Sequence, residues 1–443
     1  MEVPGRFLNR YSVLGGNVAA RLGALAAIFA ATLLVAREGG PALVGSYALL
    51  HVLPSLVGMV VSIGLTGAVA FFVAGPQRDD RRLPATIVAM AVVSGATGVA
   101  LCVAATPVSA PLLFPDMSHG LVGLAGIAVA TRLSVTTAKS CAQGSHDLGG
   151  ANAVIFAEEL MFLPTFGALT LAGAEGHAAV VGGLLLADFC TSCLAWGRLV
   201  RRDFFQEAAR PSRALARRIA GYGLRAQTGT VISQLNLRLD FVILSALTSP
   251  AVLGIYAIAS KFAELTKVLG MALTYVLYPQ FARVGPARAA ERATRLLPKG
   301  ALLTSTAVVA LFIAAGLAIP AVYGAEFDGA ITPARIIVLG LAFEGVAGVI
   351  TAFLYGAGRP GLYSLAMGAG LVATVMLDIV LIPRFEAVGA AAASAIAYAT
   401  STVALVWLFA VLRRRAPQGA KPRMTVPSVL TRKGGVSAAD RPG

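Results

Sequence analysis

The chain has 443 residues, of which 57% are hydrophobic and only 13% are charged. Soluble proteins carry roughly 25% charged residues, so this composition excludes an ordinary soluble domain and indicates a membrane protein. The net charge of +15 would suit nucleic-acid binding, but the basic residues follow the loops between apolar stretches, and we expect no nucleic-acid partner.

Twelve apolar stretches are long enough to cross a bilayer, which takes about 20 residues in a helix. The sequence therefore predicts an all-α membrane protein with twelve transmembrane helices. In chain order, the stretches cover residues 13–36, 42–74, 84–106, 120–142, 150–173, 178–199, 218–247, 251–281, 297–319, 331–356, 361–382 and 387–412.

The basic residues lie mainly on one side of these spans. With the N-terminus inside, 27 of the 36 Lys and Arg residues fall in inner segments, and only Arg37 and Arg384 fall in outer ones. This asymmetry predicts that both termini are cytoplasmic and that the inner loops attract anionic lipid head groups. The N-terminus lacks a short apolar region with a cleavage site, so we expect the first span to be retained.

The longest basic connection divides the spans into two sets of six. We expect an N-terminal lobe at 1–200, a cytoplasmic linker at 201–217, a C-terminal lobe at 218–412 and a disordered basic cytoplasmic tail at 413–443. Because six is an even number, both halves enter the membrane from the same side, and the two sets form a parallel repeat.

An octapeptide supports this division. Pro41–Ala48 reads PALVGSYA, and Pro250–Ala257, 209 residues later, reads PAVLGIYA. Each copy lies at a short break between two apolar stretches. Doubled membrane bundles are a common transporter plan in which the substrate is handled between the halves.

Ionisable side chains at membrane depth are costly and usually pair or face a wet cavity. Arg132 lies at the depth of Glu158 and Glu159, and we expect these residues to pair. Arg21 lies about eight residues inside the first span; it either snorkels to the surface or faces the same cavity as Arg225 of the corresponding seventh span.

The seventh span is polar on two opposite faces, so it must be central, with at least one face beside a wet cavity. The turn near Ser249 brings Arg238 and Asp240 to the depth of Lys261 and Glu264 in the eighth span. These residues either form structural salt bridges, such as Asp240 with Lys261, or serve the substrate.

Local carboxylates do not obviously neutralise all of Arg225, Arg238 and Lys267, which favours a functional role for these three. Asp188 and Glu344 have no obvious partner and are candidates for proton coupling, because burial raises the pKa of a carboxyl group. Asp378, near the outer end of its span, is expected to cap or anchor neighbouring structure.

The cysteines and histidines do not indicate a cofactor site. Cys190 and Cys193 have redox spacing but lie in an apolar span, where packing is the better explanation. The four histidines are scattered, so no metal site is predicted. We expect no cofactor; a coupling ion, H⁺ or Na⁺, is left open.

Several segments together resemble the polysaccharide flippases. In the second half these are Leu239–Pro250 (LDFVILSALTSP), Gly254–Lys261 (GIYAIASK), Leu354–Pro360 (LYGAGRP) and Asp378–Ala391 (DIVLIPRFEAVGAA). In the first half, Ala36–Pro41 with Gly45-Ser46-Tyr47 is similar to the same group. Each motif is loose alone, but their order and spacing make the match fairly specific.

The resemblance implies the multidrug/oligosaccharidyl-lipid/polysaccharide exporter fold, with two pseudo-symmetric six-helix lobes around a central cleft lined by spans one, two, seven and eight. It would place near the cleft five basic residues, Arg21, Arg225, Arg238, Lys261 and Lys267. The implied substrate is an undecaprenyl-pyrophosphate-linked oligosaccharide, and basic side chains suit a pyrophosphate in a low-dielectric interior. Lipid II flippases of this superfamily carry two further C-terminal spans, which argues against a peptidoglycan role.

We therefore expect an alternating-access flippase, not an enzyme, in the bacterial cytoplasmic membrane. Its partners would be the lipid-linked oligosaccharide, membrane lipids and, as further candidates, polysaccharide polymerase or export machinery. One alternative is a cation-coupled drug or metabolite exporter of the same fold. The other is a membrane glycosyltransferase or polymerase, which would need catalytic carboxylates or arginines in a sizeable outer loop.

Overall fold

The computed structural model describes residues 4–415, and in this part of the chain every regular element is a helix. The predicted disordered tail at 413–443 lies outside the described residues except for its first three. The helices are α1 (Pro4–Val61), α2 (Leu65–Ala74), α3 (Leu83–Leu113), α4 (His119–Ala125), α5 (Ala128–Gly144), α6 (Leu148–Leu160), α7 (Phe162–Leu171), α8 (Gly176–Arg201), α9 (Arg213–Leu247), α10 (Pro250–Ala282), α11 (Pro286–Tyr323), the 3-10 helix η1 (Ala325–Ala330), α12 (Ile331–Gly340), α13 (Glu344–Gly356) and α14 (Pro360–Arg415).

Within the described residues, eight helices are long and apolar enough to cross a membrane, or nine with the bent pair formed by α12 and α13. Two of the eight, α1 and α14, each run through a kink that joins two helices, at Gly39–Gly40 and at Glu386. Charged residues Lys261, Glu264 and Lys267 interrupt the apolar surface of α10. If α1 and α14 each count as two passages, and the bent pair and α10 are added, the path is consistent with the twelve predicted spans.

The two octapeptide copies occupy equivalent places in this path, each beginning a helix after a turn. Pro41 follows Gly40, whose φ of 61° is a left-handed conformation that glycine adopts without strain. Pro250 is the first residue of α10, where its missing N–H costs nothing, and the side chain of Ser249 caps the helix by accepting a hydrogen bond from the Val252 N–H at 3.4 Å. The sequence repeat is therefore a structural repeat.

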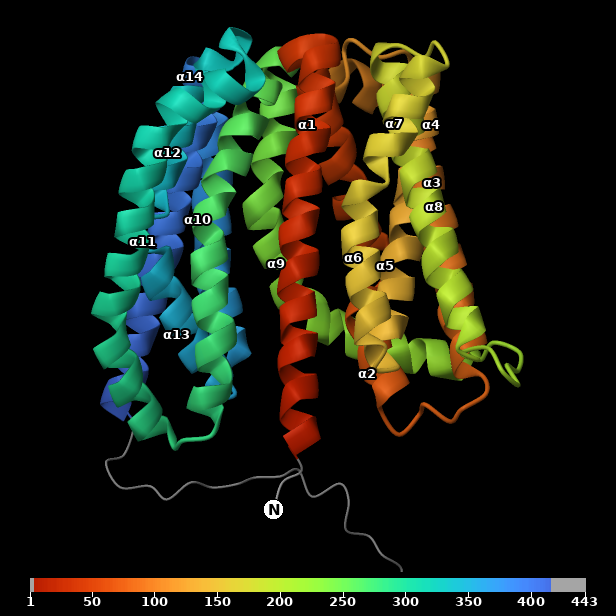
Figure 1. Ribbon diagram of the computed structural model, residues 1–443, viewed down its shortest axis with the longest axis vertical. Helices are drawn as coiled ribbons and strands as arrows, with labels where there is room; N and C mark the ends of the chain where they lie inside the picture. Colours follow the sequence, from red (N-terminus) through yellow and green to blue (C-terminus); the bar gives the residue numbers. More distant parts are fainter. Residues whose placement is uncertain (1–3, 416–443) are drawn as a thin grey trace, which may run out of the picture.

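The helices form two bundles side by side, with α1 to α8 in a first lobe and α9 to α14 in a second (Figure 1). Here the lower end of the molecule denotes the end at which α1 begins and α14 finishes, as in Figure 1. Large apolar side chains are exposed on the outer faces, including Leu171, Leu317, Val372 and Trp407. Such faces suit lipid, and the protein is a multi-pass membrane protein.

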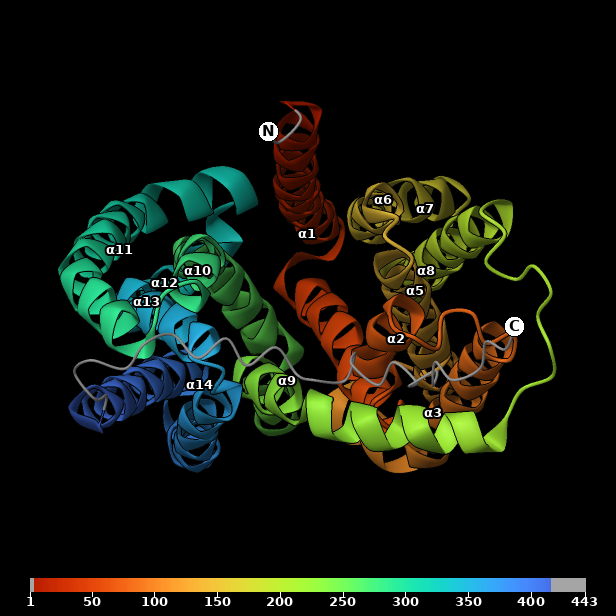
Figure 2. The ribbon, with the colours of Figure 1, turned by 90° about the horizontal axis from the view of Figure 1, so that it is seen from below.

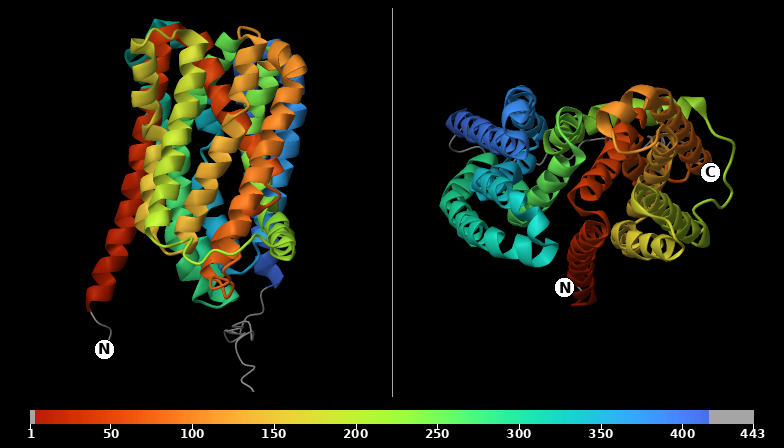
Figure 3. Two further views of the ribbon diagram at one scale, coloured as in Figure 1. Left: turned by 90° about the vertical axis from the view of Figure 1, so that its right-hand side faces the viewer. Right: turned by 90° about the horizontal axis from the view of Figure 1, so that it is seen from above.

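The start of α9 crosses beneath the first lobe before the helix rises into the second (Figures 2 and 3). Leu215 and Ile219 are buried in an apolar cluster of the first lobe, whereas Arg217 and Arg218 are exposed. The predicted linker at 201–217 thus includes helical residues, because α9 begins at Arg213. An amphipathic segment that buries one face against neighbouring helices remains helical although it is too polar to span the membrane.

The lobes meet at the upper end through a reciprocal pair of glycines, one from each octapeptide. A Cβ atom added at Gly45 would overlap the carbonyl oxygen of Pro250, and one added at Gly254 would overlap the carbonyl oxygen of Pro41. Each glycine therefore lets the backbone of one lobe lie directly on the other. We call this contact the glycine seam.

Replacing the seam glycines should hold the upper end open. In Gly45→Ala and Gly254→Ala, the new methyl group meets backbone atoms that cannot rotate away, so the distance between spin labels at Asp116→Cys and Asp328→Cys should lengthen relative to the parent. Gly197→Ala is the matched control, because an added Cβ there meets nothing within 4 Å. If the distance between the labels is unchanged in both seam variants, the glycine seam does not hold the upper end closed.

Candidate functional site

Lys261 of α10 reaches across from the second lobe to the first, about two turns below the glycine seam. Its Nζ donates a hydrogen bond of 2.6 Å to Oγ1 of Thr32 on α1 and lies 5.2 Å from the centre of the Tyr47 ring. A hydroxyl oxygen and an aromatic face both stabilise an ammonium group away from bulk water.

Directly below Lys261, two charged side chains of the second lobe form an ion pair that remains accessible. Glu264 lies one helical turn after Lys261, and its carboxylate is 3.0 Å from the guanidinium of Arg238 on α9. The two side chains are 29% and 32% exposed, although each lies several turns from the helix ends. Accessible charge at this depth, on the side that meets α1, indicates an opening between the lobes, which we call the interlobe cleft.

The opposite wall of the interlobe cleft carries His51 of α1 and Glu159 of α6. The Nε2 atom of His51 and a carboxylate oxygen of Glu159 are 4.0 Å apart, and the side chains are 32% and 18% exposed. His51 stands out in the sequence only as a polar residue within a span, and Glu159 was expected only as a partner for Arg132.

Below Lys261, the described hydrogen bonds to the first lobe come from α9 and from Ser212, the residue that caps its start. Gln227 donates to the carbonyl of Met59 at 3.3 Å, and the backbone N–H of Ser212 donates to Thr86 at 3.0 Å. The lower half of α1 packs on its own lobe instead, where Asn17 donates to Asn152 of α6 at 2.7 Å. Figure 2 shows this half of α1 standing apart from α10. Below Lys261, the described contacts between the lobes therefore lie on the side of α9, where the backbones of Gly64 and Gly223 also touch, and the lower half of α1 has no described hydrogen bond to α10.

Arg132 pairs with Asp188, 3.2 Å away, and not with Glu158 or Glu159, so the predicted pairing is wrong. Glu158 accepts instead from Lys139 at 2.6 Å. The prediction also left Asp188 without a partner. Depth along a helix was judged correctly, but the face that each helix turns toward its neighbour was not visible in the sequence.

Two further charged residues of the second lobe are satisfied inside it. Lys267 donates to the Tyr398 hydroxyl at 3.0 Å and lies 4.4 Å from the centre of that ring. Asp240 accepts from the Tyr256 hydroxyl, from Ser394 at 3.3 Å and from the backbone N–H of Phe241 at 2.9 Å. The expected pair between Asp240 and Lys261 is not formed among these contacts.

Asp378 was expected to cap or anchor structure near a helix end, but it is fully buried. Neither of its carboxylate oxygens has a hydrogen-bond partner among the described residues. Glu344 begins α13 and packs on α10 at Gly270, where an added Cβ would lie 2.6 Å from its Cγ. A buried carboxylate without partners is costly, so Asp378 is an unsatisfied charged group among the described residues of this lobe.

Arg21 and Arg225 lie lower than the residues around Lys261. Arg21 precedes Thr32 by eleven residues of helix, roughly 16 Å, and donates to Asn17 at 3.0 Å. Arg225 precedes Arg238 by thirteen residues, roughly 20 Å, and is exposed. The structure therefore gathers Arg238, Lys261 and Glu264 but leaves these two arginines nearer the lower end.

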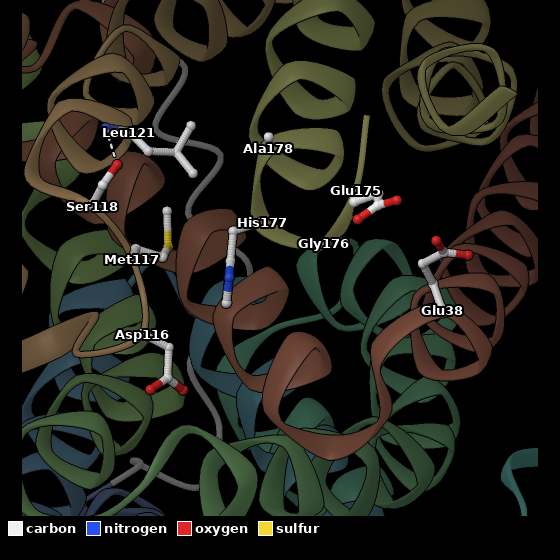
Figure 4. Close-up of a pocket in the computed structure, with 9 residues that line it drawn as sticks. All are labelled: Glu38, Asp116, Met117, Ser118, Leu121, Glu175, Gly176, His177 and Ala178. Carbon is white, nitrogen blue, oxygen red and sulfur yellow. Dashed lines mark hydrogen bonds between the residues drawn. The ribbon is translucent and has the colours of Figure 1, made fainter. Parts of the chain in front are cut away.

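A separate pocket of about 620 Å³ opens at the upper end of the first lobe. Figure 4 shows its polar lining, in which Glu38, Glu175 and Asp116 surround His177 without converging on one point. His177 is hydrogen-bonded to Ser46 at 3.1 Å. No group of three potential metal ligands occurs within the described residues. We assign no chemistry to this pocket.

At the lower end of the first lobe, Asp147 fixes the start of α6. Its carboxylate accepts from Arg198 at 2.6 and 2.9 Å and from the Gly150 N–H at 2.9 Å. The Arg198 hydrogen bond is the main reason that the pKa of Asp147 lies below its usual value, with the Gly150 N–H adding to the effect against desolvation. This contact ties α6 to α8 outside the spans.

Comparison with known proteins points to one group. A family model described as "Polysaccharide biosynthesis protein" matches residues 34–332. The probable low-salt glycan biosynthesis flippase Agl15 of Haloferax volcanii is 22% identical over 377 residues, covering 83% of this chain and 76% of that protein.

Solved structures share the fold. Lipid II flippase MurJ in an inward closed conformation has a TM-score of 0.75 at 13% identity, covering 90% of both chains. An inward-facing multidrug resistance MATE family transporter of the MOP superfamily has a TM-score of 0.73 at 13% identity, covering 89% of this chain and 96% of that one.

The buried pair between Arg132 and Asp188 should contribute strongly to the stability of the fold. Asp188→Ala leaves a buried guanidinium unpaired, which should lower the free energy of unfolding by about 3–5 kcal/mol, whereas the double variant Arg132→Met/Asp188→Leu removes both charges and should cost less. Thermal unfolding of the purified protein in detergent measures both. If Asp188→Ala were as stable as Arg132→Met/Asp188→Leu, the pairing of Arg132 with Asp188 would be contradicted.

Proposed function

The chain belongs to the polysaccharide biosynthesis protein family, and from that premise we propose that it is a flippase for a glycan linked to undecaprenyl pyrophosphate. It moves this lipid across the bacterial cytoplasmic membrane by alternating access. The observation that carries the proposal is the accessible group of Arg238, Lys261 and Glu264 at mid-depth between two lobes that close on each other above it.

Phosphate groups cannot enter a low-dielectric interior unless positive donors replace their water. Arg238 and Lys261 supply such donors from one wall of the cleft, and Lys267 lies below Lys261 on α10. In the structure, Glu264 holds Arg238 at 3.0 Å. A pyrophosphate would compete with Glu264 for the guanidinium, so this carboxylate keeps Arg238 compensated in the empty cleft and gives it up when substrate binds.

The distribution of charge sets the direction. Taking the basic lower end as cytoplasmic, the glycine seam would close the outer end, and the interlobe cleft would open to the side on which the lipid-linked glycan is made. Arg21 and Arg225 then lie on the way in, where exposed positive charge attracts the pyrophosphate before it reaches Lys261. Outward opening requires the seam to part and the lobes to rock about the bound phosphate.

Cation coupling would act through the second lobe. Asp378 and Asp240 are both buried carboxylates of this lobe, and Asp378 has no hydrogen-bond partner among the described residues. A proton or Na⁺ would neutralise this charge, so its binding and release would bias the packing of α9, α10 and α14. Glu344 stays a secondary candidate. Asp188 is not one, because Arg132 already compensates it.

A cation-coupled exporter of the same fold is the second candidate. Glu159 and Glu264 face the interlobe cleft, and a carboxylate-lined cleft would attract an organic cation. We favour the flippase because the cleft also holds Arg238 and Lys261, whose charges would repel such a substrate.

Loss of the cleft cations should stop glycan export. Arg238→Ala and Lys261→Ala should each lower export at least tenfold in a complementation assay normalised to protein level, because each removes a charge-assisted contact of about 1.5–3 kcal/mol. Arg218→Ala, an exposed arginine outside the cleft, is the control. Full glycan export by both cleft variants would contradict the flippase proposal. Export of an organic cation that persists in both variants but is abolished by Glu159→Gln would favour the exporter.

Neutralising the second-lobe carboxyls should remove the dependence on an ion gradient. In proteoliposomes, Asp378→Asn and Asp240→Asn should transport at the same rate with and without an imposed H⁺ or Na⁺ gradient, because the group that the ion neutralises has gone. Asp116→Asn, in a loop at the upper end, should keep the parent response. A preserved gradient response in both buried variants would exclude this route of coupling.

A further inference from the structure

The two walls of the interlobe cleft differ in chemistry. The second-lobe wall presents the cations Arg238 and Lys261 beside Glu264. The first-lobe wall presents an imidazole, that of His51, and the carboxylate of Glu159, both partly exposed. Their closest atoms are 4.0 Å apart, beyond hydrogen-bond distance, so neither group uses up the other.

His51 is held in one orientation from behind. A guanidinium nitrogen of Arg132 lies 2.9 Å from Nδ1 of His51, and the other terminal nitrogen donates to the His51 carbonyl at 3.1 Å and to Ser55 at 3.3 Å. A guanidinium only donates hydrogen bonds, so Nδ1 is the acceptor and the ring hydrogen lies on Nε2. The ring therefore presents an N–H group toward Glu159 and the cleft.

This orientation is itself secured by buried contacts. Arg132 is held by Asp188 at 3.2 Å, and Asp188 accepts from Thr131 at 3.2 Å. The chain of contacts from Asp188 through Arg132 to His51 fixes both the position and the tautomer of a side chain that is one-third exposed. Such support is typical of a group whose free end binds something.

An N–H donor beside a carboxylate acceptor matches a hydroxyl group, which accepts from one and donates to the other. Neighbouring hydroxyls on a sugar ring can use both. The first-lobe wall sets its carboxylate beside an imidazole, whereas the second-lobe wall has two cations, Arg238 and Lys261, for the one carboxylate of Glu264, so a pyrophosphate belongs on the second-lobe wall.

We propose that His51 and Glu159 form a saccharide subsite that binds hydroxyl groups of the glycan, with Arg132 as the residue that positions His51. The proposal rests on the proposed function and deepens it, because it divides one cleft into a phosphate wall and a sugar wall. Recognition of the glycan would then begin while the pyrophosphate is held, and a lipid without sugar would bind less tightly.

The test compares two probes on the full chain in lipid nanodiscs: undecaprenyl pyrophosphate, and the same lipid carrying one hexose. The parent protein should bind the hexose probe about tenfold more tightly, as expected for one or two added hydrogen bonds, one of them to a charged group. His51→Ala and Glu159→Ala should each remove most of this preference while leaving the affinity for the bare pyrophosphate within about twofold.

Further variants separate binding from a merely structural role. His51→Gln keeps an N–H donor and should restore part of the preference. Arg132→Lys keeps the charge facing Asp188 but loses the fork that holds His51, so it should weaken the hexose preference only. Arg238→Ala should lower the affinity for both probes, and His119→Ala, at the start of α4 at the upper end, should change neither.

The outcomes distinguish this inference from its premise. If the parent protein binds the two probes with equal affinity, the sugar subsite is overturned and the flippase proposal stands. The same conclusion follows if the preference for the hexose probe persists in both His51→Ala and Glu159→Ala. Binding of neither probe by the parent overturns the proposed function together with the subsite. Because the first comparison uses the unsubstituted protein, it does not depend on any variant folding.

Discussion

The rest of the structure depends on the contact of two backbones at the glycine seam. Gly45 and Gly254 occupy the same place in the two octapeptides, and each lies where any side chain would overlap a carbonyl oxygen of the other lobe. This contact closes the upper end and brings α10 near enough to α1 for Lys261 to reach Thr32. Because both lobes contribute identically, one pseudo-symmetric contact can open and close as a unit, with no covalent or metal link to break.

Below the seam, the surroundings of each charge separate structural pairs from candidate site residues. Arg132 and Asp188 are buried at 3.2 Å, which suits a fixed support. Arg238 and Glu264 are similarly close but about one-third exposed, so water or a substrate can reach and exchange with them. The cleft is consequently not uniformly basic. Arg238 has Glu264 as a partner and Lys261 has Thr32, which limits the free energy cost of holding these charges inside a membrane. Both partners can be replaced by a substrate group.

The sequence was sufficient for the parts of the account that depend on length and periodicity. The apolar stretches coincide with helices, as at 178–199 within α8, and the octapeptide indicated two related halves, although that its glycines form the contact between the lobes is known only from the structure. The sequence was insufficient wherever the contacts of a residue depend on the direction in which its side chain leaves the helix. Arg132 was assigned the wrong carboxylates, Asp378 was placed at a helix end, and His51 was passed over, because its role arises only from Arg132 behind it and Glu159 beside it. The start of α9 was missed because its polar residues conceal a helix that packs sideways.

The most direct measurement of the central claim is the accessibility of a cysteine at position 264. In a chain whose cysteines at 102, 141, 190 and 193 are replaced, Glu264→Cys would be treated with a membrane-impermeant thiol reagent from each side of sealed vesicles. The account predicts rapid labelling from the side of the termini and little from the other side while the seam is closed. Protection of that cysteine from both sides would mean that no hydrated passage exists between the lobes, and would contradict the account.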